Sequence, residues 1–130
     1  MIIRFFLPLI FVFTIVQFSA AAEERKEKPK QFIYVLRLVP RLYSDSAWTK
    51  EDEAALKQHF DRFKRATETG QLILAGRTQE SGEKTFGIAV FEASDEAAAR
   101  KFMESDPAVV AGLMTAELHP FAVALQRKNP

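Results

Sequence analysis

Apolar segments alternate with amphipathic segments along residues 31–125, and this pattern predicts the order of the elements. In four segments aromatic and branched side chains dominate, and proline, glycine or a polar turn follows, which is typical of β-strands. The second and third of these strands are expected to form a hairpin around the turn at 80–83. The expected strands are 31–38, 71–77, 84–92 and 114–125.

Two helices are predicted between these strands. The first follows a capping position at Thr49 and ends at Gly70. The second follows a capping position at Ser94 and ends before Asp106-Pro107, because the residue before a proline is disfavoured in a helix. The first helix has one apolar stripe with spacings of four, three and four residues. Its members are Leu56, Phe60, Phe63 and Thr67.

The order β-α-β-β-α-β is typical of a ferredoxin-like α+β fold, with four antiparallel strands and both helices on one face. The first strand carries apolar side chains on both sides, with Phe32 and Tyr34 on one and Ile33 and Val35 on the other. The helices can cover only one face of the sheet. We therefore expect a homodimer packed sheet against sheet, the alternative being a monomer with a hydrophobic ligand groove.

Residues 1–22 are typical of a secretory signal peptide. Arg4 is the only charge, an apolar run follows it, and small residues at 19–22 place the expected cleavage before Glu23. The apolar core at 5–18 is shorter than the about 20 residues that cross a bilayer, which disfavours an uncleaved anchor. The sequence therefore predicts a periplasmic or secreted protein with no stable membrane insertion after cleavage.

The rest of the chain divides into a charged tether at 23–30, one domain at 31–126 and a polar tail at 127–130. Without Arg4 it carries 17 basic and 17 acidic side chains, so no nucleic-acid partner is expected. The chain has no cysteine, which excludes disulfides and a thiol nucleophile. An exported domain of this kind must rely on its core and on subunit packing for stability.

His59 and Asp106 are the candidates for catalysis. His59 flanks the apolar stripe of the first helix, where a half-buried imidazole can transfer protons near neutral pH. The alternative is a histidine that only packs at the rim of the core. Asp106 could orient an imidazole or act as a base, or it could only cap the turn that begins at Pro107.

Arg37 is the candidate for ligand binding, because a guanidinium in an otherwise apolar strand can bind an anionic group. An ion pair at a dimer edge is the alternative. Arg77 is interpreted as an exposed charge at a strand end, and His119 as a strand-surface residue. The sequence has no pattern of metal ligands, phosphate-binding glycines or a nucleophilic serine, so neither a metal nor a cofactor is expected.

Seven short segments, taken in order, resemble the YCII-related (YciI-like) family. The resemblance spans residues 31–125 and implies a ferredoxin-like fold that forms a dimeric α+β barrel. It also implies that His59 and Asp106 form an active-site pair. The segments are 31–38, 59–63, 70–76, 86–91, 94–97, 105–107 and 118–121.

Two hypotheses on function stay open. The first is a small-molecule enzyme in which His59 is the general acid/base, Asp106 is its partner and Arg37 binds an anionic group. The second is a non-catalytic dimeric module of the cell envelope that binds a small ligand or a protein. Because a fold does not determine chemistry, the geometry around His59 must distinguish them.

Overall fold

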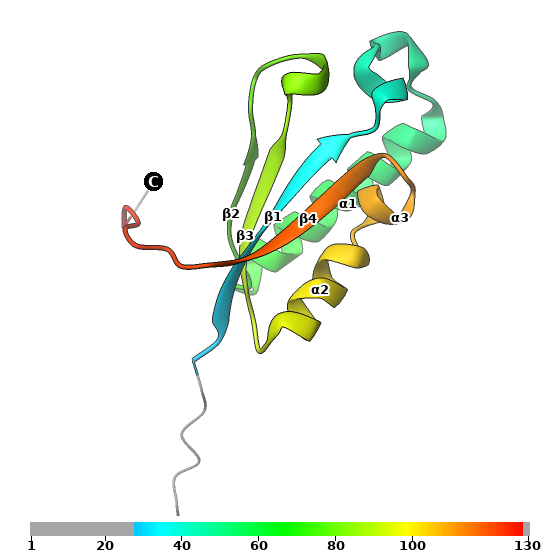
Figure 1. Ribbon diagram of the computed structural model, residues 1–130. Coiled ribbons are helices and arrows are strands. Elements are labelled where there is room, and N and C mark those ends of the chain that lie inside the picture. The colour runs from blue at the N-terminus through cyan, green and yellow to red at the C-terminus, as the bar shows by residue number, and fades with distance from the viewer. Residues whose placement is uncertain (1–27, 129–130) are drawn as a thin grey trace, which may run out of the picture.

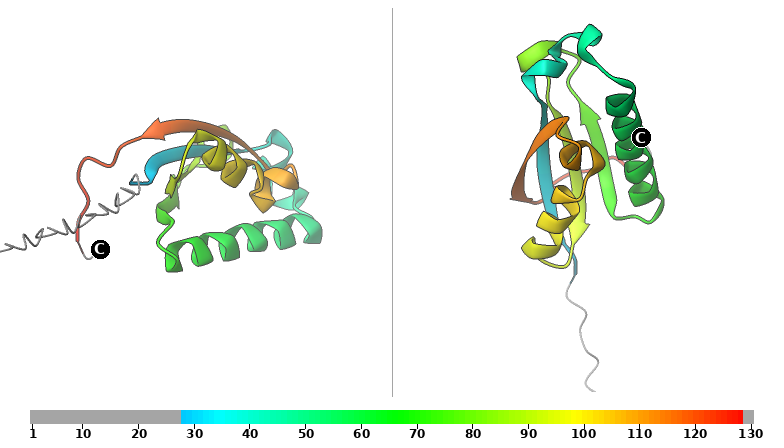
Figure 2. Two further views of the ribbon diagram at one scale, coloured as in Figure 1. Left: turned by 90° about the horizontal axis from the view of Figure 1, so that it is seen from below. Right: turned by 90° about the vertical axis from the view of Figure 1, so that its right-hand side faces the viewer.

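Four antiparallel strands form the sheet of the computed structural model, which describes residues 28–128 (Figure 1). The strand order is β2-β3-β1-β4, and the helices lie on one face of the sheet (Figure 2). The ferredoxin-like α+β fold predicted from the sequence is thus confirmed. The expected signal segment 1–22 lies outside the described residues. The elements are β1 (Lys30–Leu38), α1 (Lys50–Glu68), β2 (Leu72–Arg77), β3 (Gly87–Ala93), α2 (Glu96–Glu104), α3 (Pro107–Val110) and β4 (Met114–Phe121).

The first turn of α1 is fixed by a capping box. The Thr49 hydroxyl accepts a hydrogen bond from the Asp52 backbone at 3.2 Å, and the Asp52 carboxylate accepts one from the Thr49 backbone at 3.0 Å. Arg41 donates two further hydrogen bonds, of 2.8 and 2.7 Å, to the same carboxylate. These contacts join the start of α1 to the 3₁₀ helix Pro40–Tyr43, and Arg41 holds the pKa of Asp52 well below its ordinary value. At the other end of α1, Gly70 has a φ of 79°, as expected for a terminating glycine.

Two strands are shorter than the sequence predicts. β3 begins at Gly87, because residues Gly82–Lys84 form a 3₁₀ helix instead of extending the strand. β4 ends at Phe121, which pairs with Gln31 close to the start of β1 at Lys30. Beyond it, the Val123 backbone donates to the Gln31 side chain at 2.8 Å.

The cap of α2 and the buried face of α1 also differ from the prediction. The cap of α2 is Asp95, whose carboxylate accepts a hydrogen bond from the Ala98 backbone at 2.7 Å, and not Ser94. In α1 the buried stripe runs through His59 and Phe63, whereas Phe60 is 58% exposed. The sequence placed His59 beside the stripe, but its ring lies within the buried face of the helix.

The register of β1 with β3 separates the two faces of the sheet. Phe32, Tyr34 and Leu36 are buried on the helix side, where they pack with residues of α1 and α2. Ile33 and Val35 lie on the other side, and no helix in the described part covers that face (Figure 2). The expectation of apolar residues on both faces is therefore correct.

None of the described helices combines the length and the apolar character that a membrane span requires.

Candidate active site

The fold brings the two predicted catalytic residues into contact. His59 lies in the middle of α1, and Asp106 is the capping residue of α3. Nδ1 of His59 lies 2.7 Å from Oδ1 of Asp106 across 47 residues of sequence. Both side chains are buried, with His59 5% and Asp106 0% exposed. This contact joins α1 to α3.

A third residue, Tyr34, completes this buried cluster. Its hydroxyl donates a hydrogen bond of 2.8 Å to Oδ2 of Asp106. The Ala108 backbone N–H donates one of 2.9 Å to Oδ1, so both carboxylate oxygens are held in place. Sequence reasoning missed Tyr34, although a tyrosine on the core face of a strand signals that its hydroxyl needs a buried partner.

The electrostatics of the cluster keep Asp106 ionised. Burial by itself raises the pKa of Asp106. Hydrogen bonds from His59, the Tyr34 hydroxyl and the Ala108 N–H, together with the charge that His59 carries when protonated, outweigh burial and lower that pKa below its ordinary value. Burial, together with the Asp106 charge, raises the pKa of Tyr34 far above its ordinary value. Tyr34 is therefore a neutral donor, and Asp106 is an acceptor at neutral pH.

An ionised Asp106 determines which nitrogen of His59 carries the proton. A carboxylate only accepts hydrogen bonds, so Nδ1 must be the protonated nitrogen of the neutral ring. Nε2 then holds the free lone pair, and no hydrogen bond within residues 28–128 occupies it. The cluster thus holds the neutral His59 ring in the tautomer whose Nε2 can accept a proton.

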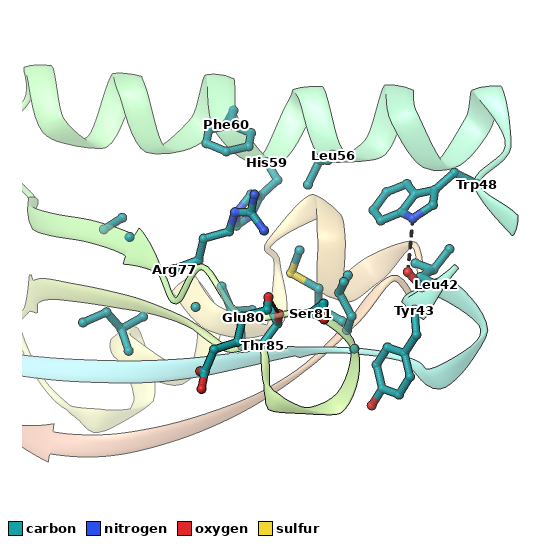
Figure 3. A pocket seen from close by; sticks show the side chains of 18 of the residues that line it. Leu42, Tyr43, Trp48, Leu56, His59, Phe60, Arg77, Glu80, Ser81 and Thr85 are labelled. Carbon is teal, nitrogen blue, oxygen red and sulfur yellow. Dashed lines mark hydrogen bonds between the residues drawn. The ribbon is translucent and has the colours of Figure 1, made fainter. Parts of the chain in front are cut away.

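A cavity of 540 Å³ lies beside His59 (Figure 3). His59 contributes to its lining, whereas Asp106 and Tyr34 lie behind the ring and do not. The 3₁₀ turn at Pro40–Tyr43 and the β2–β3 loop supply further walls. Most of the lining is apolar, which favours an organic ligand. The apolar lining residues include Leu36, Leu38, Leu42, Trp48, Leu56, Phe60, Phe63 and Met114.

The structure does not place Arg37 in this cavity. Arg37 lies on the other face of β1, where its guanidinium stacks on the Phe86 ring at 5.3 Å from the centroid. Arg77 at the end of β2 lines the cavity instead, and its side chain extends toward the helix that carries His59 (Figure 3). His119 is exposed on β4, with Nε2 3.5 Å from Glu117. Among the described residues, no group of three or more His, Cys, Asp or Glu side chains is suited to a metal ion.

The fold and the site together define a ferredoxin-like α+β domain with a buried His–Asp–Tyr cluster beside an apolar cavity. Residues 33–121 match the YCII-related domain, and the chain belongs to this family. A search of the curated proteins found no match. Among solved structures, the chain is similar to SnoaB, a cofactor-independent oxygenase from Streptomyces nogalater. The two share 17% identity over 77% of this chain and 95% of that chain, with a TM-score of 0.38.

Replacing Asp106 with Asn tests the energetic role of the carboxylate. At neutral pH we expect a loss of about 2 kcal/mol in the free energy of unfolding, because His59 and Tyr34 lose a charged acceptor. The pKa of Asp106 is lower in the folded than in the unfolded chain, so its stabilising contribution is complete above about pH 4 and disappears as the pH falls through the folded value. The difference between wild type and variant should therefore shrink on acidification, as measured by urea unfolding from pH 7 to pH 3.

Asp95→Asn is the matched control, because Asp95 also caps a helix but is exposed and contacts neither His59 nor Tyr34. It should cost only a few tenths of a kcal/mol, since Asn and Asp are comparable caps. An equal loss in the two variants, or a loss in Asp106→Asn that does not change with pH, would contradict the assignment.

Proposed function

We propose that this YCII-related protein is an enzyme that acts on a small organic molecule, with His59 as its general acid/base. The observation that carries the proposal is the 2.7 Å contact between buried Asp106 and His59, whose ring lines a 540 Å³ cavity. Burial of a carboxylate is costly unless partners compensate it, and here the partner is a ring that borders the cavity. A buried carboxylate with a lowered pKa, in contact with a histidine that lines a cavity, is a common feature of catalytic sites.

The proposed chemistry is proton transfer. Nε2 of His59 takes a proton from the bound molecule, and the resulting imidazolium donates through Nδ1 to the ionised Asp106. The same nitrogen then returns the proton to another position of the molecule or to water. The apolar lining around the ring limits the access of water and strengthens the interaction of the imidazolium with Asp106. Tyr34 supports the reaction indirectly, because its hydrogen bond fixes Oδ2 of Asp106.

His59→Asn tests this role with limited damage to the fold, because the Asn side-chain amide can replace the Nδ1 donor to Asp106. A panel of small carbonyl compounds, phenols and carboxylic acids is incubated with the protein in D₂O, and NMR detects exchange of carbon-bound hydrogen. We expect the variant to slow wild-type exchange by about 10²–10⁴-fold, the usual contribution of a general base.

His119→Asn is the control, since it changes the second of the two histidines of the chain, which is exposed on β4. It should leave the exchange rates unchanged. If the panel compounds bind but exchange at the same rate with wild type and His59→Asn, the site binds without catalysing, which favours the non-catalytic module.

We further propose that a second copy of the chain covers the open face of the sheet. Ile33 and Val35 on β1 and Ile88 on β3 make the centre of this face apolar, and the described helices all lie on the opposite face. Sedimentation equilibrium at micromolar concentration should detect a dimer of the wild type. Val35→Glu should shift it to monomer, because the variant places a charge at the centre of the apolar contact.

Gln58→Glu, which adds the same charge to the exposed side of α1, should leave the dimer intact. A wild type that sediments only as a monomer would contradict the dimer.

Export is also proposed, and it rests on the pattern of residues 1–22. A protein recovered from outside the cytoplasm should begin at Glu23, or within one or two residues of it, by N-terminal sequencing. Recovery of the protein with Met1 intact would contradict cleavage.

A further inference from the structure

Within residues 28–128, Arg77 is the one Lys or Arg residue that lines the cavity beside His59. We propose that its guanidinium binds the carboxylate or another anionic group of a ligand whose remaining part is apolar. The inference deepens the proposed function, because it assigns a chemical class to the molecule on which His59 acts. The sequence pattern favoured Arg37 for this role, but Arg37 lies on the other face of the sheet.

The strand register places Arg77 on the cavity side of the sheet. Arg77 pairs with Gly87 of β3, which in turn pairs with Leu36, a buried residue on the helix side of β1. An irregularity in β2 between Leu72 and Leu74 sets this register. A Cβ at Gly87 would lie 3.4 Å from the Gly76 carbonyl oxygen and 3.7 Å from the Leu36 Cβ. A side chain at position 87 would therefore contact the Gly76 backbone and Leu36.

The guanidinium of Arg77 has no partner of its own in the described part of the chain. Residues 28–128 give it no ion pair and no side-chain hydrogen bond, whereas Arg41 pairs with Asp52. Asp45 and Glu80 also line the cavity, but neither forms an ion pair with Arg77. The planar N–H donors of Arg77 are thus available to a carboxylate, which they can bind through two hydrogen bonds.

The position of Arg77 relative to His59 gives the anion a role in the reaction. The Arg77 side chain extends from β2 toward the face of α1 that carries His59 (Figure 3). A carboxylate held there brings its neighbouring carbon toward the catalytic ring. The positive charge then stabilises the negative charge that develops when Nε2 removes a proton from that carbon. The apolar lining accommodates the rest of the molecule.

Trp48 provides a direct measurement, because it is the only tryptophan of the chain and lines the cavity. Its fluorescence is titrated with phenylacetate and 3-phenylpropanoate, and with the corresponding uncharged amides. We expect the wild type to bind each acid at least about tenfold more tightly than its amide, as a charge-assisted bidentate contact allows. Arg77→Leu should abolish this preference, and Arg77→Lys should retain only part of it.

Arg37→Leu is the matched control, since it removes the same side chain from the opposite face of the sheet. It should keep the preference for acids. Equal binding of acid and amide by the wild type, or loss of the preference in Arg37→Leu but not in Arg77→Leu, would overturn the inference.

The experiments distinguish a failure of the Arg77 assignment from a failure of the proposed function. Hydrogen exchange that depends on His59, without a preference for acids, would overturn the role of Arg77 alone. A preference for acids that depends on Arg77, without exchange that depends on His59, would support the anion site and overturn the general base.

Discussion

The buried carboxylate of Asp106 is the constraint on which the rest of this structure depends. An ionised group without exposure to water is tolerated only when charged or hydrogen-bonding partners surround it. Here the donors come from three elements: Tyr34 from β1, His59 from α1 and the Ala108 backbone from α3. The two helices must therefore lie at a fixed distance from the sheet, so one interaction both supports the packing and sets the tautomer of His59.

The cavity exists because separate contacts hold neighbouring segments of the chain apart around the His59 ring. Arg41 and Asp52 join the turn at Pro40–Tyr43 to the start of α1, and the Trp48 indole donates a hydrogen bond of 3.2 Å to the Leu42 carbonyl. These contacts fix one wall of the cavity independently of the Asp106 cluster. The site therefore combines a histidine ring that Asp106 fixes in place with a separately supported apolar lining, as a preorganised site requires.

The sequence was sufficient for the fold, because turn residues and apolar periodicity act locally, and the family resemblance singled out His59 and Asp106, which the structure brings into contact. The sequence pattern was insufficient for features that depend on contacts between residues far apart in the chain. Whether Arg37 or Arg77 faces the cavity depends on strand register and on the irregularity in β2, which local periodicity does not encode. Tyr34 was missed for a similar reason, since its partner lies 72 residues away in the chain.

The most direct test of this account is the protonation of the His59 ring, observed by ¹⁵N NMR at a pH where the ring is neutral. We predict a proton on Nδ1, hydrogen-bonded to Asp106, and an unprotonated Nε2 that faces the cavity. Asp106→Asn should remove this preference, whereas Asp95→Asn should keep it. A wild-type ring with its proton on Nε2, or with rapid exchange between the two tautomers, would contradict the central claim.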